Sequence, residues 1–216
     1  MDYTITLRSD LSTGMWPKAQ QAAAKYQLNK FLKSMPKGTI GYVAGGAPRD
    51  WHHGWGCRDL DIFYKVPATY DDMNAAEKVL EKYHTTHNYS GYDYTGQPIV
   101  SVHEYPVHSG SLRFRKVQLI RLEVNPIVVI KDFPINLSHI WMDTKGHIKC
   151  DFHYYYGYNA RIIREVHRNQ YNYTYLEKIL PRFDDYTFCP LGWQGERPEA
   201  TAIPDYKVED ALDSND

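Results

Sequence analysis

Cysteine is scarce in this chain of 216 residues: Cys57, Cys150 and Cys189 are odd in number and far apart. That pattern excludes a disulfide framework and a cysteine-rich zinc site. No apolar run in the sequence approaches the ~20 residues that cross a bilayer. The first residues also lack the charged-then-apolar pattern of a signal peptide. We therefore expect a cytoplasmic protein with no membrane partner.

Several short functional signatures are missing as well. The chain has no P-loop, no dinucleotide fingerprint and no local nucleophile motif. Its net charge is only −1, far from that of an obligate nucleic-acid binder. The last 22 residues hold seven acidic and only two basic side chains, which leaves the preceding part mildly basic. We predict one domain over residues 1–194 and an acidic, loosely held tail over residues 195–216.

Tyrosine, by contrast, is abundant, with 19 residues. Its ring offers stacking area and its hydroxyl a polar tip, which suits a surface that meets nucleobases. The alternative is that most of these rings are half-buried against sheet faces. Composition alone does not choose between the two.

Hydrophobic patterning predicts an α/β (α+β) fold: a short mixed sheet with helices packed on one side and a pair of C-terminal helices. The range 126–130 fits either a strand or a short helix, and residues 144–146 fit a hairpin turn. Strands are expected at 3–7, 39–44, 59–64, 99–103, 116–122, 137–143 and 147–152, and helices at 17–35, 48–53, 70–82, 159–168 and 173–179.

The stretch 43–64 carries the strongest chemical signal. An expected strand ends in Gly45 and Gly46, and a helix follows, an arrangement that lets backbone N–H groups approach an anion. Asp59 and Asp61 then open the next strand, where residues two apart share a face. Two neighbouring carboxylates repel each other unless a cation lies between them, and Mg²⁺ prefers such ligands together with phosphates. The stretch therefore predicts a site for metal-assisted nucleotidyl transfer.

The same stretch resembles the signature of the DNA polymerase beta-like nucleotidyltransferase superfamily. It is most similar to the head domain of poly(A) polymerases and CCA-adding tRNA nucleotidyltransferases. Seven positions match at the expected spacing: Gly45, Gly46, Arg49, Asp50, Gly54, Asp59 and Asp61.

The resemblance implies a role for most of these residues. Asp59 and Asp61 would coordinate two metal ions, Mg²⁺ or Mn²⁺, and Gly45 and Gly46 would bind the triphosphate of an NTP through the backbone. Arg49 would hold phosphate or position Asp50. The alternative for Arg49 is an ion pair that only closes a turn.

The sequence departs from the family where a later strand usually supplies a third catalytic carboxylate. The best candidate strand, 116–122, has Gln118 at its central polar position. An amide orients a ligand but does not act as a base. Glu104 and Glu123 are the nearest acids in the sequence, so one of them completes the site or two carboxylates suffice.

Beyond residue 64 the likeness is loose. The combination of the segments 45–54 (GGAPRDWHHG), 59–63 (DLDIF) and 117–120 (VQLI) resembles small nucleotidyltransferase-like proteins of bacteriophages. The remaining residues are too few for the helical RNA-binding domains of CCA-adding enzymes, so we do not expect tail addition to tRNA. The expected activity is transfer of a nucleotidyl group from an NTP to an RNA end, a protein or a small molecule. The alternatives are a weak or inactive relative that binds nucleotide, RNA or a host protein as a sensor or inhibitor, and a virion component.

Weaker patterns each allow two interpretations. His52 and His53 either contact phosphate or acceptor, or face solvent. His84 and His87 form a metal site or belong to a surface loop. Two groups of basic residues either bind phosphate or only face solvent. The first group lies beside an expected strand, where the alternative is a solvated sheet edge protected against aggregation. It consists of Arg113, Arg115 and Lys116. The second group lies on an expected helix, where the alternative is a solvated helix face. It consists of Arg161, Arg164 and Arg168.

Overall fold

The computed structural model describes residues 4–7, 15–83, 99–105, 114–166, 172–192 and 208–209. A mixed sheet of eight strands forms its centre, in the order β10-β1-β7-β6-β2-β3-β5-β4. The β3–β5 pair is parallel and every other neighbouring pair is antiparallel. In sheet order the strands are Val208–Glu209, Thr4–Thr6, Ile148–Cys150, Ile140–Met142, Ile40–Ala44, Asp59–Lys65, Lys116–Leu122 and Ile99–Tyr105.

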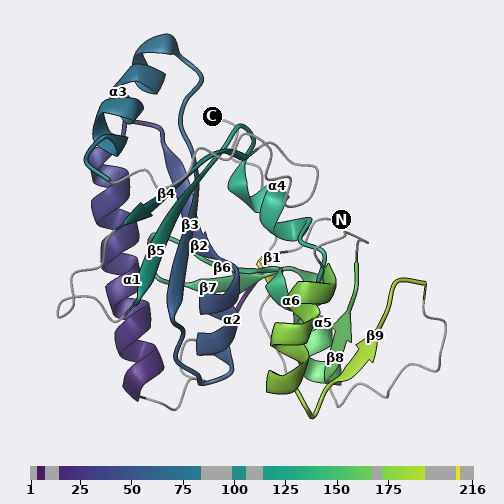
Figure 1. Cartoon of the computed structure of the whole chain (residues 1–216). Coiled ribbons are helices and arrows are strands. Elements are labelled where there is room, and N and C mark those ends of the chain that lie inside the picture. The colour runs from purple at the N-terminus through teal and green to yellow at the C-terminus, as the bar shows by residue number, and fades with distance from the viewer. Residues whose placement is uncertain are drawn as a thin grey trace.

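Helices cover both faces of this sheet, with α1 on one side and α4 on the other (Figure 1). A smaller parallel pair, β8 (Ile162–Arg164) with β9 (Thr187–Cys189), lies beside the last helices. None of the helices in the described ranges is long and apolar enough to cross a membrane. The α-helices are α1 (Met15–Ser34), α2 (Gly46–His52), α3 (Tyr70–Leu80), α4 (Pro126–Lys131), α5 (Phe152–Ala160) and α6 (Asn172–Ile179), and short 3₁₀ turns are η2 (Asn136–Ser138) and η3 (Leu180–Arg182).

Alternation along β3 divides the hydrophobic core between the two faces. Ile62 packs with Leu28 of α1 in one cluster, which also takes in side chains of α2 and α3. Phe63 packs with Ile130 of α4 in a second cluster on the opposite face. Asp59 and Asp61 share the parity of Phe63, so the carboxylates lie on the α4 face of the sheet. The sequence predicted helices on one side of the sheet. Helices α1 to α3 do lie together on one face, but α4 covers part of the opposite face.

The short segment from Pro126 is helical because its first turn is well capped. The Asn125 side chain accepts a hydrogen bond from the Ile127 N–H at 3.1 Å, and Pro126 occupies the first helical turn, where its missing N–H costs nothing. The expected hairpin is confirmed as β6 and β7, which pair in antiparallel register.

The helix predicted over residues 159–168 is wrong. Helix α5 begins earlier, because Asp151 caps it by accepting from the Tyr154 N–H at 2.9 Å. It ends at Ala160, where Arg161 adopts the left-handed conformation with φ 54°. The β-branched Ile162 and Ile163 then pair with β9 as a strand. Arg161 and Arg164 therefore do not share a helix face.

One continuous hydrophobic cluster includes residues from Ile5 to Tyr186. Val208 and Glu209 pair with β1 as the outermost strand. Most of residues 195–216 lie outside the described ranges, so the domain boundary at residue 194 stays a prediction.

Candidate active site

The two predicted carboxylates open strand β3 on one face of the sheet. In register, Asp61 lies opposite Ala44 of β2 on one side and opposite Gln118 of β5 on the other. Because Ala44 is the last residue of β2, Gly45 follows directly beside Asp61. The fold thus brings Gly45, Asp61 and Gln118 into one row, with Asp59 two residues along β3.

The glycine turn leaves backbone groups open next to these acids. Gly45 has φ 77°, and a Cβ atom there would lie 3.2 Å from Oδ2 of Asp61. It caps α2, and no side chain among the described residues hydrogen-bonds to this cap. The N–H groups of the first turn of α2, which begins at Gly46, therefore lack a side-chain acceptor. This backbone-lined space suits an anion.

Asp61 is an unusual carboxyl group. Its pKa is raised from 3.8 to about 7, mainly by burial and then by the nearby charge of Asp59, while Lys116 opposes both effects. A cation between the two carboxylates would favour their ionised forms. The donor set therefore fits a hard divalent cation that shares its remaining coordination positions with phosphate and water. No group of three His, Cys, Asp or Glu side chains able to hold a metal occurs among the described residues.

Gln118 connects these carboxylates to a third acid. In one orientation its amide nitrogen donates to Oε1 of Glu104 at 3.3 Å. In the other, which satisfies both ends of the amide, the nitrogen donates to Oδ1 of Asp61 at 3.1 Å and the oxygen accepts from Nζ of Lys116 at 3.1 Å. Lys116 also forms an ion pair with Glu104. Asp61, Gln118, Lys116 and Glu104 thus form one polar cluster across three strands.

The register decides between the two acids that could complete the site. Glu104 on β4 lies directly opposite Gln118. Glu123 is exposed and follows the far end of β5, about 17 Å from Gln118 at the usual rise of a strand. Glu123 is therefore not positioned to complete the site, and Glu104 is the only one of the two that lies near it.

Arg49 and Asp50 lie on α2, and each is only 4% exposed. Nε and Nη2 of Arg49 donate to Oδ1 of Asp50 at 3.1 and 2.9 Å, and Nη1 donates to the Tyr175 hydroxyl at 2.8 Å. A Cβ atom on Gly46 would lie 3.3 Å from Nη2, so the guanidinium borders the glycine turn. This geometry suits the positioning role of Arg49, because three of its five N–H groups already have protein partners.

Three further residues belong to this network and were not predicted. Arg182 in η3 contacts the second oxygen of Asp50 at 3.1 Å. The hydroxyl groups of Tyr175 and Ser138 lie 2.8 Å apart. These contacts fasten α2 to α6 and η3, and join residues so far apart in sequence that no local pattern signals them.

The solvent-facing interpretation of His52 and His53 is wrong, because both rings are packed among aromatic side chains. Nδ1 of His52 lies 2.8 Å from the Tyr154 hydroxyl, and Nε2 of His53 lies 3.0 Å from the Tyr186 hydroxyl. Burial lowers the pKa of His52 to about 3 and that of His53 to about 4. Both are neutral near pH 7 and serve packing. Four tyrosines in the described ranges are buried as well: Tyr64, Tyr154, Tyr155 and Tyr186.

The lysine of the first basic group does not lie at an edge of the sheet. Lys116 is on β5, which lies between β3 and β4, so the interpretation of a protected sheet edge is wrong. His84 and His87 lie outside the described residues.

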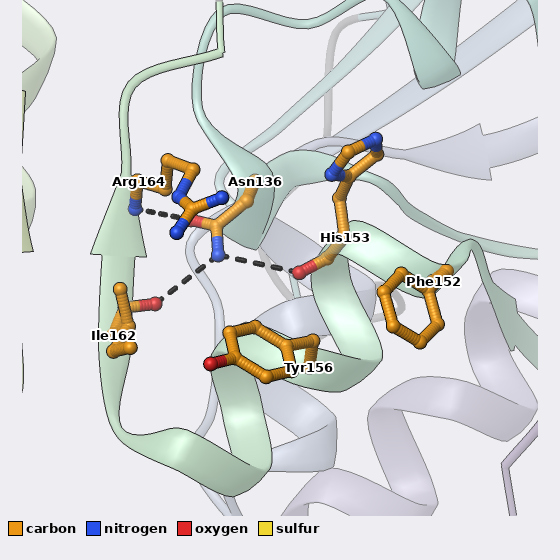
Figure 2. A pocket seen from close by; sticks show the side chains of 6 residues that line it. All are labelled: Asn136, Phe152, His153, Tyr156, Ile162 and Arg164. Carbon is orange, nitrogen blue, oxygen red and sulfur yellow. Dashed lines mark hydrogen bonds between the residues drawn. The ribbon is translucent and has the colours of Figure 1, made fainter. Parts of the chain in front are cut away.

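A cavity of about 160 Å³ lies between η2, α5 and β8, and none of the predicted site residues lines it (Figure 2). Its polar wall is Asn136, whose amide nitrogen donates to the carbonyl oxygens of Ile162 at 3.1 Å and His153 at 3.3 Å. The amide oxygen accepts from the Arg164 N–H at 2.8 Å. Asn136 therefore holds β8 to α5.

Comparisons with known proteins bear on the fold. No family model matches the sequence, and no curated protein matches it. Among solved structures, the Thermotoga maritima CCA-adding enzyme complexed with tRNA is similar over 88% of this chain and 43% of its own, with a TM-score of 0.56 and 16% identity. A CCA-adding enzyme in complex with ATP has a TM-score of 0.56 and 17% identity, and one in complex with CTP has a TM-score of 0.53 and 16% identity. Both cover the same fractions of the two chains as the first structure.

At these identities the likeness establishes the fold. The chain has the mixed α/β nucleotidyltransferase fold found in CCA-adding enzymes, which confirms that prediction. It spans less than half of the length of those enzymes.

Proposed function

We propose that this chain transfers a nucleotidyl group from an NTP to an acceptor hydroxyl, with Mg²⁺ or Mn²⁺ at Asp59 and Asp61. The observation that carries this proposal is the position of Asp61, whose Oδ2 borders the glycine turn while Asp59 lies on the same strand face. A backbone turn that suits phosphate and a carboxylate pair that suits a cation thereby lie side by side. Neither the turn nor the carboxylate pair alone would point to a triphosphate.

Each residue has a distinct task in this proposal. The backbone at Gly45 and Gly46 binds phosphate oxygens of the triphosphate, and Arg49 holds Asp50 and the start of α2 in position. Asp59 and Asp61 hold the cation. When bound, the cation polarises the α-phosphate and lowers the pKa of the acceptor hydroxyl. The hydroxyl oxygen then bonds to the α-phosphorus, the bond to the β-phosphate breaks, and pyrophosphate leaves.

The solved neighbours support an NTP as the substrate, because two of them hold ATP and CTP. The tRNA in a third supports an RNA acceptor, and a protein or small-molecule hydroxyl remains chemically equivalent. Since this chain corresponds to 43% of that enzyme, we do not extend its tRNA specificity to this protein.

A second function is favoured by one specific observation. Strand β5 presents Gln118 and Lys116 beside the carboxylates where the resemblance implies an acid. A chain that lost its third carboxylate could bind nucleotide and transfer nothing, acting as a sensor or inhibitor. Nucleotide binding is common to both functions, whereas covalent transfer belongs only to the first.

The test combines binding with label transfer. Purified protein is titrated with each of the four NTPs and Mg²⁺ or Mn²⁺, then incubated with α-labelled NTP and candidate acceptors. We expect binding that is lost in the double variant Asp59→Asn/Asp61→Asn and kept in the surface control Asp184→Asn/Asp185→Asn. If no NTP binds, or the double variant binds equally well, the site assignment fails. Binding without Asp61-dependent label transfer would instead favour the sensor.

A further inference from the structure

A lysine lies beside the two carboxylates, and its position differs from that of an ordinary surface cation. Lys116 is opposite Asp59 in the parallel β3–β5 register, so both side chains lie on the same face of the sheet. It is paired with Glu104 from β4, and the oxygen of Gln118 accepts from its Nζ at 3.1 Å. The ammonium group is thus held within the carboxylate cluster.

The two oxygens of Asp61 face different surroundings. Oδ1 points toward β5 and accepts from the Gln118 amide at 3.1 Å. Oδ2 points toward Gly45, where no side chain intervenes. A divalent cation that approaches from the Gly45 side meets Oδ2 and the phosphate-binding backbone. One that approaches from the β5 side meets N–H donors and an ammonium group, which repel it.

A second cation would need an anionic ligand on β5, and Gln118 does not provide one. Glu104 is the nearest acid, but its charge is already neutralised by Lys116. An ammonium group can still stabilise a polyphosphate as a point charge. The β5 side of the site is therefore built to contact phosphate through a lysine.

We infer that this chain holds one divalent cation, between Asp59 and Asp61, and that Lys116 supplies the positive charge on the β5 side of the triphosphate. The inference rests on the proposed function and adds to it. Glu104 acts as the anchor of Lys116 and does not bind the metal.

The test counts cations. Mn²⁺ is titrated into the full chain with a non-hydrolysable ATP analogue, and bound Mn²⁺ is measured by electron paramagnetic resonance. We expect one ion per chain in the wild type and in the control Lys65→Gln, which alters a lysine at the other end of β3. The double variant Lys116→Gln/Gln118→Asp creates a third carboxylate beside Asp61 and should bind two. Two ions in the wild type, or one in this variant, would overturn the inference.

Two single variants separate the roles of Lys116 and Glu104. Lys116→Gln should weaken binding of the analogue in EDTA by about tenfold, the usual effect of losing one charge-assisted hydrogen bond. Glu104→Gln should leave the Mn²⁺ affinity within about twofold, whereas loss of a true ligand would lower it at least tenfold. A loss of that size in Glu104→Gln would make Glu104 a ligand and refute the inference. If the wild type bound neither Mn²⁺ nor analogue, the proposed function itself would fail, whereas two ions would overturn only the one-cation inference.

Discussion

Oδ2 of Asp61 lies 3.2 Å from the point where a Cβ atom of Gly45 would stand. The backbone of Gly45, with φ 77° and ψ −137°, is also in a region that side-chain-bearing residues rarely adopt. The close approach of strand β2 to the carboxylate therefore requires glycine for two independent reasons. Conformational strain and steric contact predict different consequences, and a matched pair of variants separates them.

Gly45→Ala should lower the free energy of unfolding by about 1–3 kcal/mol, the cost of an unfavourable backbone conformation. It should also weaken NTP binding, because the methyl group displaces Asp61. The control is Gly192→Ala, which has a similar φ of 82° and open space around its Cβ position. Urea unfolding and nucleotide titration of both variants provide the measurement. Equal nucleotide affinity in Gly45→Ala and wild type would contradict the predicted contact.

Asp61→Asn should stabilise the metal-free protein at pH 8. The ordinary pKa of 3.8 is raised to about 7 in the folded chain, mainly by burial and then by Asp59. Between these values the folded state binds a proton that the unfolded state has lost, so the stability falls as pH rises. A shift of three units corresponds to about 4 kcal/mol. Since Asp61 is partly exposed, we expect a gain of about 2 kcal/mol in Asp61→Asn at pH 8.

This gain should disappear near pH 4, where the carboxyl group is protonated in the folded state. Thermal unfolding of the variant and the wild type at pH 4, 6 and 8 in EDTA measures it. Adding Mg²⁺ and an NTP analogue should then stabilise only the wild type, because a ligand stabilises the state that binds it. A constant difference between the two proteins at all three pH values would show that Asp61 titrates normally.

The stretch 43–64 allowed most of the carboxylate site to be predicted because its chemistry is local. Strand alternation gives Asp59 and Asp61 a common face, and the adjacent glycines mark the turn. What the sequence did not reveal is pairing across strands. Only the β4–β5 register brings Glu104 opposite Gln118 and leaves Glu123 at the far end of β5. That register is a pairing between two separate strands, and no periodicity within either strand encodes it.

The C-terminal part was predicted less well for a related reason. Polar and aromatic residues from Asn159 onward fit a helical pattern, but tertiary pairing with β9 overrides that weak propensity at Ile162 and Ile163. The partners of Arg49 and Asp50, which are Tyr175 and Arg182, follow more than 120 residues later. Long-range contacts of this kind become visible only when the helices are packed.

Arg49→Ala should cost about 3–5 kcal/mol of stability, because it leaves the buried Asp50 carboxylate without its main partner. Tyr175→Phe keeps the Arg49–Asp50 pair and removes only a hydroxyl, so it should cost about 1 kcal/mol. Urea unfolding of the two variants measures the difference. A stable Arg49→Ala protein with weakened NTP binding would instead assign Arg49 to phosphate contact.

The His52–Tyr154 contact should contribute to acid sensitivity. Burial, with a smaller effect of His53, lowers the pKa of His52 from 6.5 to about 3. The unfolded chain therefore binds a proton that the folded chain rejects, and stability is lost as pH falls below 6.5. At pH 5 this group alone lowers the free energy of unfolding by about 2 kcal/mol.

The double variant His52→Phe/Tyr154→Phe removes both polar partners. Between pH 7 and pH 5, the wild type should lose about 2 kcal/mol more of its free energy of unfolding than this variant does. Tyr154→Phe alone should retain the full pH dependence, so equal slopes in all three proteins would exclude His52 as the source.

Gly157 packs so closely against Asn136 that a side chain at this position has no room. A Cβ atom there would lie 1.9 Å from Nδ2 of Asn136 and 2.7 Å from the carbonyl oxygen of Ile162. Gly157→Ala should therefore lower stability by about 3 kcal/mol through overpacking. Asn136→Ala should cost at least about 3 kcal/mol, because it leaves up to three backbone groups without a partner (Figure 2). The double variant removes the first clash but not the second, so its cost should fall short of the sum by about 1 kcal/mol. Strict additivity in urea unfolding would mean that the two residues do not contact each other.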